Sequence, residues 1–207
     1  MVLRVILFII LLLVFAGTAW WYNRRRQMGI DLMNVYRLRM DGVPVFTRLQ
    51  KFLRIYGIPP EVRIRRESYP IHSEDEFYTL LDRACKDGDE FDLHYEGFVM
   101  NYFRDTRLII TSIDFRKTEL GLDYGDWRFD RSFTFGDFEA LFPISAGMDV
   151  HRTTGIQSCF EINTGESAFD KETYMVQRWS KDNLLAGPTV EFTFEDGRLI
   201  YMFFANF

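Results

Sequence analysis

Eleven large apolar residues follow one another without a break from Val5 to Phe15, close to the amino terminus of the chain. Residues 16–22 extend this run to 18 uncharged positions, which as a helix would be about 27 Å long, close to the roughly 30 Å hydrocarbon core of a bilayer. A surface helix of a globular domain would interleave polar residues on one side. The run therefore predicts a segment that crosses a membrane, with lipid contacts through residues 5–22.

The residues after the run favour a retained anchor. Trp20, Trp21 and Tyr22 are followed by three consecutive arginines, and an aromatic belt followed by cations is typical of a helix end at the headgroups. The alternative is a cleaved signal peptide, which a short apolar core with small residues at Gly17 and Ala19 would also fit. We predict a single-pass membrane protein in which residues 1–27 are the anchor and its basic flank.

The orientation of the anchor has arguments on both sides. The arginines at 24–26, together with Arg37 and Arg39, favour a body in the cytoplasm by the positive-inside rule. Short amino-terminal tails that stay inside while the body is exported argue the other way. Cys85 and Cys159 do not decide between the compartments, because two thiols are either free or paired. We expect the body in the cytoplasm.

The charge is distributed unevenly along the chain. Of the 25 basic residues, four lie in residues 1–27, which hold no acid, so residues 28–207 carry 21 basic and all 30 acidic residues, a net charge of −9. An acidic body argues against a general nucleic-acid-binding protein, which needs a basic footprint. The 47% hydrophobic and 17% aromatic content excludes a disordered chain.

The body is predicted to be an α+β fold. Capping and apolar spacing predict helices from Thr47 to Tyr56, from Ser73 to about Cys85, and after Thr134 until Pro143. Alternating segments bounded by turn residues, such as Asp41-Gly42 and Asp196-Gly197, predict the strands. These are residues 34–40, 61–67, 90–95, 97–103, 107–116, 124–133, 157–162, 173–179, 189–194 and 198–207.

The two halves of the body align with each other. A shift of 91 residues matches six residues of the first hairpin with six of the last: Val99, Phe103, Asp105, Arg107, Leu108 and Ile109 with Val190, Phe194, Asp196, Arg198, Leu199 and Ile200. A shift of 89 matches Leu49, Phe52 and Leu53 with Phe138, Leu141 and Phe142. We predict a duplication with units at 28–117 and 118–207, each a short helix packed on an antiparallel meander. Convergence is the alternative, because every hairpin favours Asp and Gly at its turn.

A short helix followed by a meander whose last hairpin carries Asp-x-Arg-Leu-Ile resembles the small α+β modules of the beta-lactamase inhibitory protein and of the outer-membrane assembly lipoprotein BamE. The resemblance covers residues 45–116 and 130–207. Bacterial envelope and immunity proteins share such modules. The resemblance implies a scaffold that binds other proteins and performs no chemistry, and it transfers no binding residue.

The residues that carry chemistry form no local motif. His72, His94 and His151 are too far apart for a metal-ligand motif. The acidic stretch from Asp87 to Asp92 fails as a calcium loop, because Asp92 stands where that loop requires glycine. The sequence therefore predicts no catalytic residue, cofactor or metal.

Two cysteines and three arginines have predicted roles outside these motifs. Cys85 and Cys159 are predicted to be small buried hydrophobes. Arg63, Arg65 and Arg66 lie on one predicted strand, with Arg63 and Arg65 on one face. They would hold a partner's carboxylate or phosphate, or form an exposed edge that blocks aggregation.

Two functional classes remain. The first is a membrane-tethered, non-catalytic module that binds a protein partner, possibly basic, with exposed aromatic residues as anchors. Most aromatic residues of the segment 127–142 must be core by their spacing, and any that are exposed would serve as such anchors: Trp127, Phe129, Phe133, Phe135, Phe138 and Phe142. The second is a membrane-bound hydrolase with a site around His94 or His151. A concave site where a histidine meets a carboxylate would favour the hydrolase.

Overall fold

The computed structural model describes residues 17–18, 31–103, 107–147, 163–166, 171–178 and 189–204. Within these residues the chain is an α+β fold with a mostly antiparallel sheet and few helices, as the sequence predicts. No helix in these ranges is long and apolar enough to cross a membrane. The predicted membrane segment at 5–22 lies outside the described residues, except for Gly17 and Thr18.

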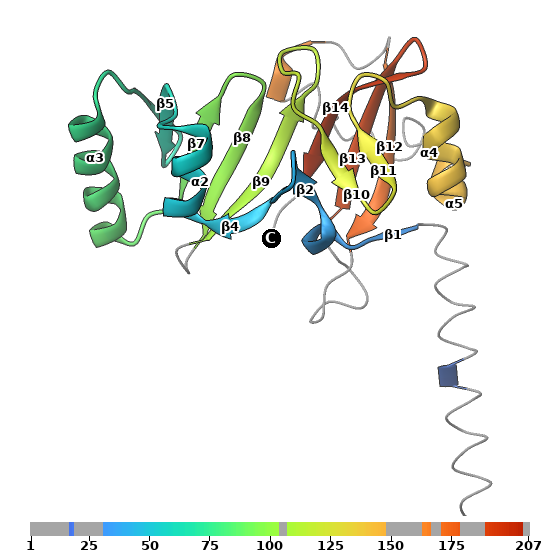
Figure 1. The fold of residues 1–207 in the computed structure, drawn as a ribbon, viewed down its shortest axis with the longest axis horizontal. Coiled ribbons are helices and arrows are strands. Elements are labelled where there is room, and N and C mark those ends of the chain that lie inside the picture. Colours follow the sequence, from blue (N-terminus) through green and yellow to red (C-terminus); the bar gives the residue numbers. More distant parts are fainter. Residues whose placement is uncertain are drawn as a thin grey trace, which may run out of the picture.

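Ten of the described strands form one large sheet (Figure 1), in the order β1-β12-β13-β14-β9-β8-β7-β5-β6 with β4 paired to β9. Its amino-terminal strands are β1 (Leu32–Met33), β4 (Phe46–Arg48), β5 (Glu61–Ile64), β6 (Glu67–Pro70), β7 (Phe91–Tyr95), β8 (Phe98–Phe103) and β9 (Arg107–Asp114). Its carboxyl-terminal strands are β12 (Glu172–Arg178), β13 (Thr189–Glu195) and β14 (Arg198–Phe204). The predicted strand at 157–162 lies outside the described residues.

Two antiparallel meanders, β7-β8-β9 and β12-β13-β14, make up most of this sheet. Their last strands pair antiparallel, with Ser112 opposite Phe203 and Ile113 opposite Met202. The two meanders are therefore joined edge to edge, and the chain's last described strand lies in the middle of the sheet (Figure 1).

The pairing corrects the predicted match between the two hairpins. Phe103 lies opposite Arg107 in the first hairpin, whereas Glu195 lies opposite Arg198 in the second. The second turn is thus one residue shorter, so Arg107 and Arg198 differ by 91 but Phe103 and Glu195 differ by 92. The strand pairing makes Glu195, and not Phe194, the counterpart of Phe103, so the predicted match is wrong by one position. The same correction applies to the match of Val99 with Val190.

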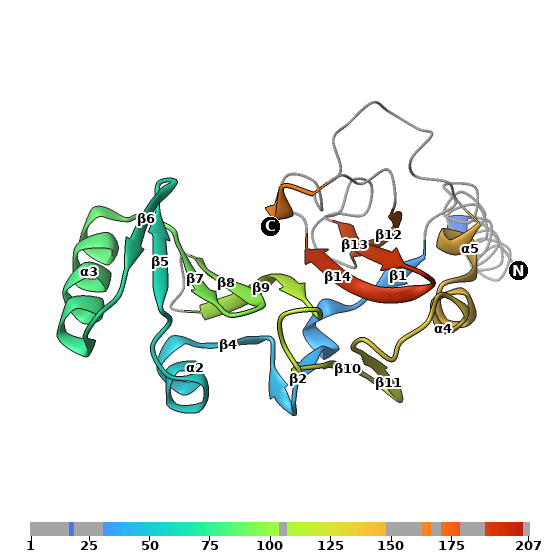
Figure 2. The same ribbon diagram turned by 90° about the horizontal axis from the view of Figure 1, so that it is seen from above.

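The helices and a small second sheet cover one face of the large sheet. The helices are α2 (Leu49–Tyr56), α3 (Glu74–Asp87), α4 (Phe135–Leu141) and α5 (Pro143–Ala146), and a 3-10 helix, η1, spans Val35–Arg37. The small sheet has the order β11-β10-β2-β3, from β11 (Trp127–Phe129), β10 (Leu122–Tyr124), β2 (Arg39–Met40) and β3 (Val43–Pro44). Figure 2 shows the large sheet curved, with α2 and the small sheet on its convex side.

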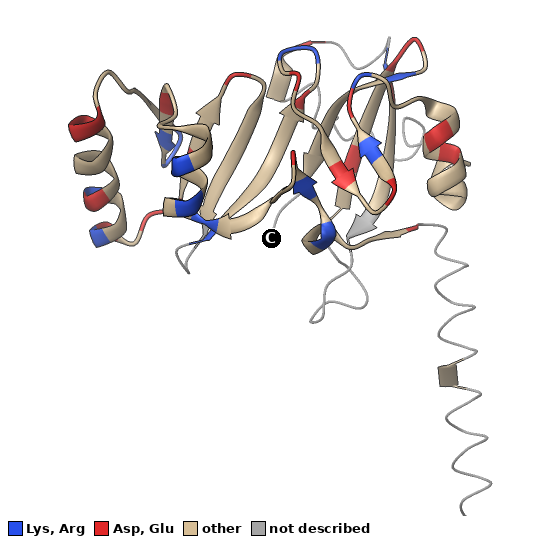
Figure 3. Ribbon diagram, viewed as in Figure 1, with Lys and Arg blue, Asp and Glu red and all other residues tan. Residues whose placement is uncertain are grey.

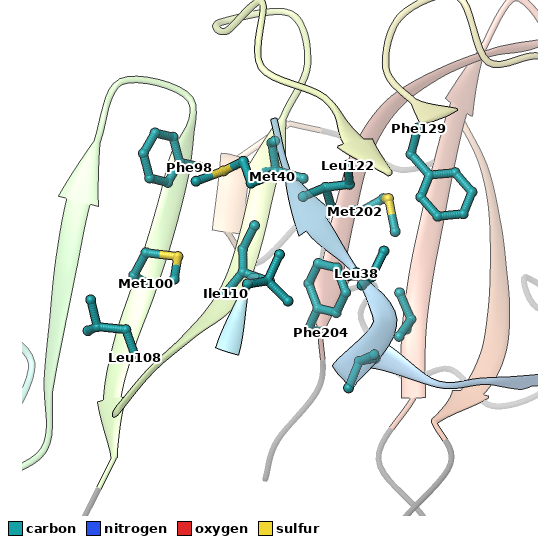
Figure 4. Packing of buried hydrophobic residues seen from close by; sticks show 14 of the residues in the cluster. Leu38, Met40, Phe98, Met100, Leu108, Ile110, Leu122, Phe129, Met202 and Phe204 are labelled. Carbon is teal, nitrogen blue, oxygen red and sulfur yellow. The ribbon is translucent and has the colours of Figure 1, made fainter. Parts of the chain in front are cut away.

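One hydrophobic core fills the space under the convex face. Side chains of the small sheet and the preceding segment, among them Leu38, Leu122 and Phe129, pack against those of the large sheet (Figure 4). Residues of both meanders contribute to this contact, including Met100 and Phe204, each at most 1% exposed. The small sheet therefore spans the junction of the two meanders and ties the halves into one core.

The predicted helices are present, with corrections at one start. α2 begins at Leu49 with Arg48 at its N-cap, so the predicted cap at Thr47 is wrong, because Thr47 lies in β4 opposite Leu108. Phe52 is buried at 1% exposure, as predicted, while Leu49 and Leu53 are only half-buried.

The cap of α4 is confirmed. Thr134 Oγ1 accepts from the Asp137 backbone N–H at 3.2 Å, and the Asp137 carboxylate accepts from the Thr134 N–H at 2.9 Å.

The predicted strand at 61–67 is a tight hairpin. β5 and β6 are joined by Arg65 and Arg66, whose φ angles are +51° and +76°. Positive φ at both central residues defines the type I′ turn, whose backbone twist matches that of the two flanking strands in a hairpin. The sequence signal was missed because such turns usually contain Gly or Asn.

Candidate binding groove on the concave face of the sheet

Strand alternation places the core residues of β7 and β8 on the convex face and the residues between them on the concave face. Two rows of directly opposed side chains cross this concave face. One row is Arg63, Asp92 and Asn101, and the other is Glu61, His94, Val99, Ser112 and Phe203. The concave face over β5, β7, β8 and β9 is therefore mainly polar, in contrast to the convex face.

Two adjoining cavities lie along these rows, and we call them together the groove. The first has a volume of about 250 Å³ and is lined by, among others, Asp92, His94, Asn101, Ser112 and Phe203. The second has a volume of about 600 Å³ and is lined by residues that include Arg63, Arg65, Arg66, Asp89 and Asp92. The groove thus runs from the middle of the sheet to the β5–β6 turn and carries groups of both charges.

His94 is the central titratable side chain of the groove. Its Nε2 atom is buried, and no described residue forms a hydrogen bond with it. Burial lowers the pKa of His94 below its ordinary value, the nearby charge of Arg63 lowers it further, and Asp92 and Glu61 oppose this change. The imidazole is therefore neutral at pH 7.

The carboxylates beside His94 are engaged by other side chains. Glu61 Oε1 accepts from Ser68 Oγ and from Arg63 Nε, each at 2.8 Å, and the Ser68 hydrogen bond lowers the pKa of Glu61 most. Asp92 Oδ1 accepts from Asn101 Nδ2 at 2.8 Å. His94 and Asp92 therefore share the groove, but in the described part of the chain no hydrogen bond joins His94 to Asp92 or to Glu61.

Ser112 is the hydroxyl nearest in the row to His94, yet it is badly placed for nucleophilic catalysis. β8 lies between the strands that carry these two residues, so their backbones are separated by two strand spacings, about 10 Å. A nucleophile and its base need hydrogen-bond contact. His151, the other histidine proposed for a hydrolytic site, lies outside the described residues, as does Cys159.

The structure brings the three predicted arginines together at one end of the groove. Arg63 extends from β5, whereas Arg65 and Arg66 form the turn, so Arg65 does not share a strand face with Arg63 as predicted. Arg65 Nη2 lies 2.7 Å from Asp89 Oδ1. Arg66 is exposed and forms no ion pair with any described residue.

The structure overturns the prediction for Cys85. Cys85 is exposed, not buried, because the buried stripe of α3 consists of Phe77, Leu81 and Ala84 and the next residue already points away from it.

None of the six aromatic residues singled out in segment 127–142 is exposed: four are at most 3% exposed and two are half-buried against the core. The expected aromatic anchors are therefore not supplied by this segment.

Sequence reasoning missed the groove as a site. The alternation within β7 was visible, since Asp92 and His94 interrupt Phe91 and Leu93. What was missing was the strand order that places Arg63 and Asn101 on either side of Asp92. Comparison of the chain with protein-family models, curated proteins and solved structures found no match.

Proposed function

We propose that this protein is a membrane-tethered, non-catalytic module that binds another protein through the groove. Residues 5–22 form the tether and the body lies in the cytoplasm. An envelope factor, an inhibitor and an immunity-type protein all fit this description. The body consists of two similar units, at 28–117 and 118–207, that arose by duplication.

One observation carries the proposal: among the described residues, the helices and the small sheet pack on the convex face, and the concave face over β5, β7, β8 and β9 carries the polar groove. A sheet whose convex face is fixed by a continuous core is a preorganised surface, and preorganisation lowers the cost of binding. The groove offers donors and acceptors of both charges, such as Arg66, Asp92 and His94. Since the six aromatic residues of segment 127–142 lie in or against the core, polar contacts and shape supply the recognition in the groove.

The strand register supports the duplication. Ser112 and Phe203 lie opposite each other where the two meanders meet, and they differ by 91, the offset that matches Arg107 with Arg198. The 91-residue shift therefore exchanges the two residues of this pair, so a local two-fold axis passes between them. The two last strands are therefore placed as two copies of one unit would be in a symmetric pair.

The body's net charge of −9 favours a basic partner. Complementary charge speeds encounter, and salt screens it over roughly 8–10 Å. We expect the association to weaken as the salt concentration rises.

Photo-cross-linking in native membranes tests the proposal. A photoreactive amino acid at Arg66, in the groove, should yield a cross-linked partner whose amount falls at high salt, whereas the same probe at Tyr78, an exposed position on α3, should not. Adding purified protein without the probe should compete the product away. A product of equal yield from both positions, or none from Arg66, would overturn the proposal.

The hydrolase stays the second candidate, because His94 shares a cavity with Asp92 and Ser112. Turnover against panels of ester and peptide substrates, compared among wild type, His94→Ala and His151→Ala, separates the two functions. Turnover that either variant abolishes would replace the binding module with the hydrolase.

The tether is tested separately by deletion and extraction. Removing residues 1–27 should give a soluble, folded body, because about 180 residues can bury a full core. Full-length protein should stay in membranes during alkaline extraction, and its release would disprove the tether.

A further inference from the structure

A second surface, distinct from the groove, gathers exposed cations near the convex side. We define the basic surface as Arg37 on η1, Arg48 at the start of α2, Lys51 and Arg54 on α2, and Arg107 at the start of β9, all of them exposed. Figure 3 shows blue bands on α2 and beside β4.

Within the described residues, the basic surface differs from cations elsewhere in its ion pairing. Cations elsewhere pair with acids: Arg65 with Asp89, Arg116 with Asp114 and Arg128 with Asp41. Within the described residues, none of the five cations of the basic surface forms an ion pair.

Two of these cations even oppose each other. Arg48 lies directly across from Arg107 in the β4–β9 pair, and like charges in that position destabilise a sheet. An acidic protein that concentrates repelling cations on one surface has a surface suited to an anion.

Apolar side chains are interspersed with these cations. Tyr36 is 49% exposed and Ile55 is 51% exposed. The Tyr36 ring packs edge-on against Phe46 with centroids 5.3 Å apart, and the Arg107 guanidinium lies 5.1 Å from the centroid of the same Phe46 ring. Cations mixed with exposed tyrosine and isoleucine are typical of surfaces that lie at a bilayer interface.

The chain enters the body on this side of the molecule. The Asp31 carboxylate accepts hydrogen bonds from the backbone N–H groups of Ile144 and Ser145, each at 2.9 Å, which fixes Asp31 to the start of α5. Residues 23–30 separate Asp31 from the end of the predicted membrane segment, and even fully extended they reach at most about 30 Å. The tether therefore keeps the edge that carries β1 close to the headgroups.

We infer that the basic surface binds anionic phospholipid headgroups and holds the body against the membrane that anchors it. This inference rests on the proposed tether. Phosphate groups would contact Arg48, Lys51 and Arg54, while Tyr36 and Ile55 enter the interfacial layer. Lipid is favoured over a macromolecular polyanion by the short connection to the membrane segment and by these exposed apolar side chains.

Full-length protein in vesicles provides the experiment. In a background with Cys85→Ser and Cys159→Ser, an environment-sensitive fluorophore is placed at Gln50→Cys, an exposed position on α2. Vesicles of phosphatidylcholine alone are compared with vesicles containing phosphatidylglycerol. We expect a blue shift and a several-fold loss of quenching by an aqueous quencher only with the anionic vesicles.

Matched charge reversals make the test specific. The triple variant Arg48→Glu, Lys51→Glu and Arg54→Glu should lose the response. The control triple Lys86→Glu, Arg131→Glu and Arg198→Glu, which changes the net charge equally at exposed positions elsewhere, should keep it.

The outcomes separate the two proposals. Release of the protein by alkaline extraction refutes the tether. If the protein is retained but the fluorophore does not respond to phosphatidylglycerol, the docking surface alone is refuted. The same holds if both triple variants lose the response equally. A response to RNA or an acidic peptide without vesicles that matches the response to anionic lipid would also overturn it, in favour of a macromolecular partner.

Discussion

Gly97 offers the sharpest test of the close packing at one end of the sheet. It follows Glu96 in the two-residue turn between β7 and β8, and its φ is +82°. A Cβ atom added there would lie 2.7 Å from Thr118 Cβ and 3.0 Å from the carbonyl carbon of Lys117. Gly97→Ala therefore brings both a backbone penalty and a steric one.

The magnitude follows from these two terms. A non-glycine residue in the left-handed region costs about 1–2 kcal/mol, and forcing an extra methyl group against packed atoms costs about 1–3 kcal/mol. Gly97→Ala should thus lower the free energy of unfolding by about 2–5 kcal/mol. Gly125→Ala is the matched control, because Gly125 has φ +64° but no atom within 4 Å of the added Cβ. It should show the backbone term alone.

Urea unfolding of the full-length protein in detergent, followed by tryptophan fluorescence, measures both variants against wild type. Gly97→Ala should cost less unfolding free energy in a Thr118→Gly background than in wild type, since Thr118→Gly removes the nearest contact. The double variant is therefore compared with Thr118→Gly alone. Equal destabilisation by Gly97→Ala and Gly125→Ala would refute the steric argument and leave only the φ angle.

Three further predictions concern the core, a buried ion pair and pH. Phe138→Ala should cost about 3–5 kcal/mol in unfolding free energy, because Phe138 is fully buried, whereas Leu53→Ala, at a half-buried position, should cost less than about 2 kcal/mol; urea titration of both variants decides. Arg116→Met should cost about 2–3 kcal/mol in the same assay, because it leaves the Asp114 carboxylate, whose side chain is 8% exposed, without its bidentate partner. Burial lowers the pKa of His94 below 6.5, so just below pH 6.5 the unfolded chain binds more protons than the folded protein. The unfolding free energy should therefore fall as the pH drops below about 6.5, and a slope that persists unchanged in His94→Gln would contradict this assignment.

Local sequence signals located most of the elements. The Asp41-Gly42 and Asp196-Gly197 turns are where the sequence predicts them, because positive φ at a hairpin turn is a property of a few neighbouring residues. The Thr134 cap follows the same logic, since its partner Asp137 is three residues away.

Errors arose where a distant contact outweighed the local preference. Thr47 is a good helix cap by sequence, yet pairing with Leu108 draws it into β4. Cys85 lies next to an apolar stripe by sequence, but which face of α3 is buried depends on where that helix packs.

The sequence by itself determined an α+β body of antiparallel hairpins, its acidic charge and the apolar run from Val5, because alternation, turn chemistry and composition act over short stretches of chain. The tertiary structure alone decided that β14 pairs with β9, that the sheet curves, and that Arg63, Asp92, His94 and Asn101 share one groove. The β9–β14 and β5–β7 pairings join strands separated along the chain. Their pairing depends on closing loops of many residues around a common core, which no local pattern encodes.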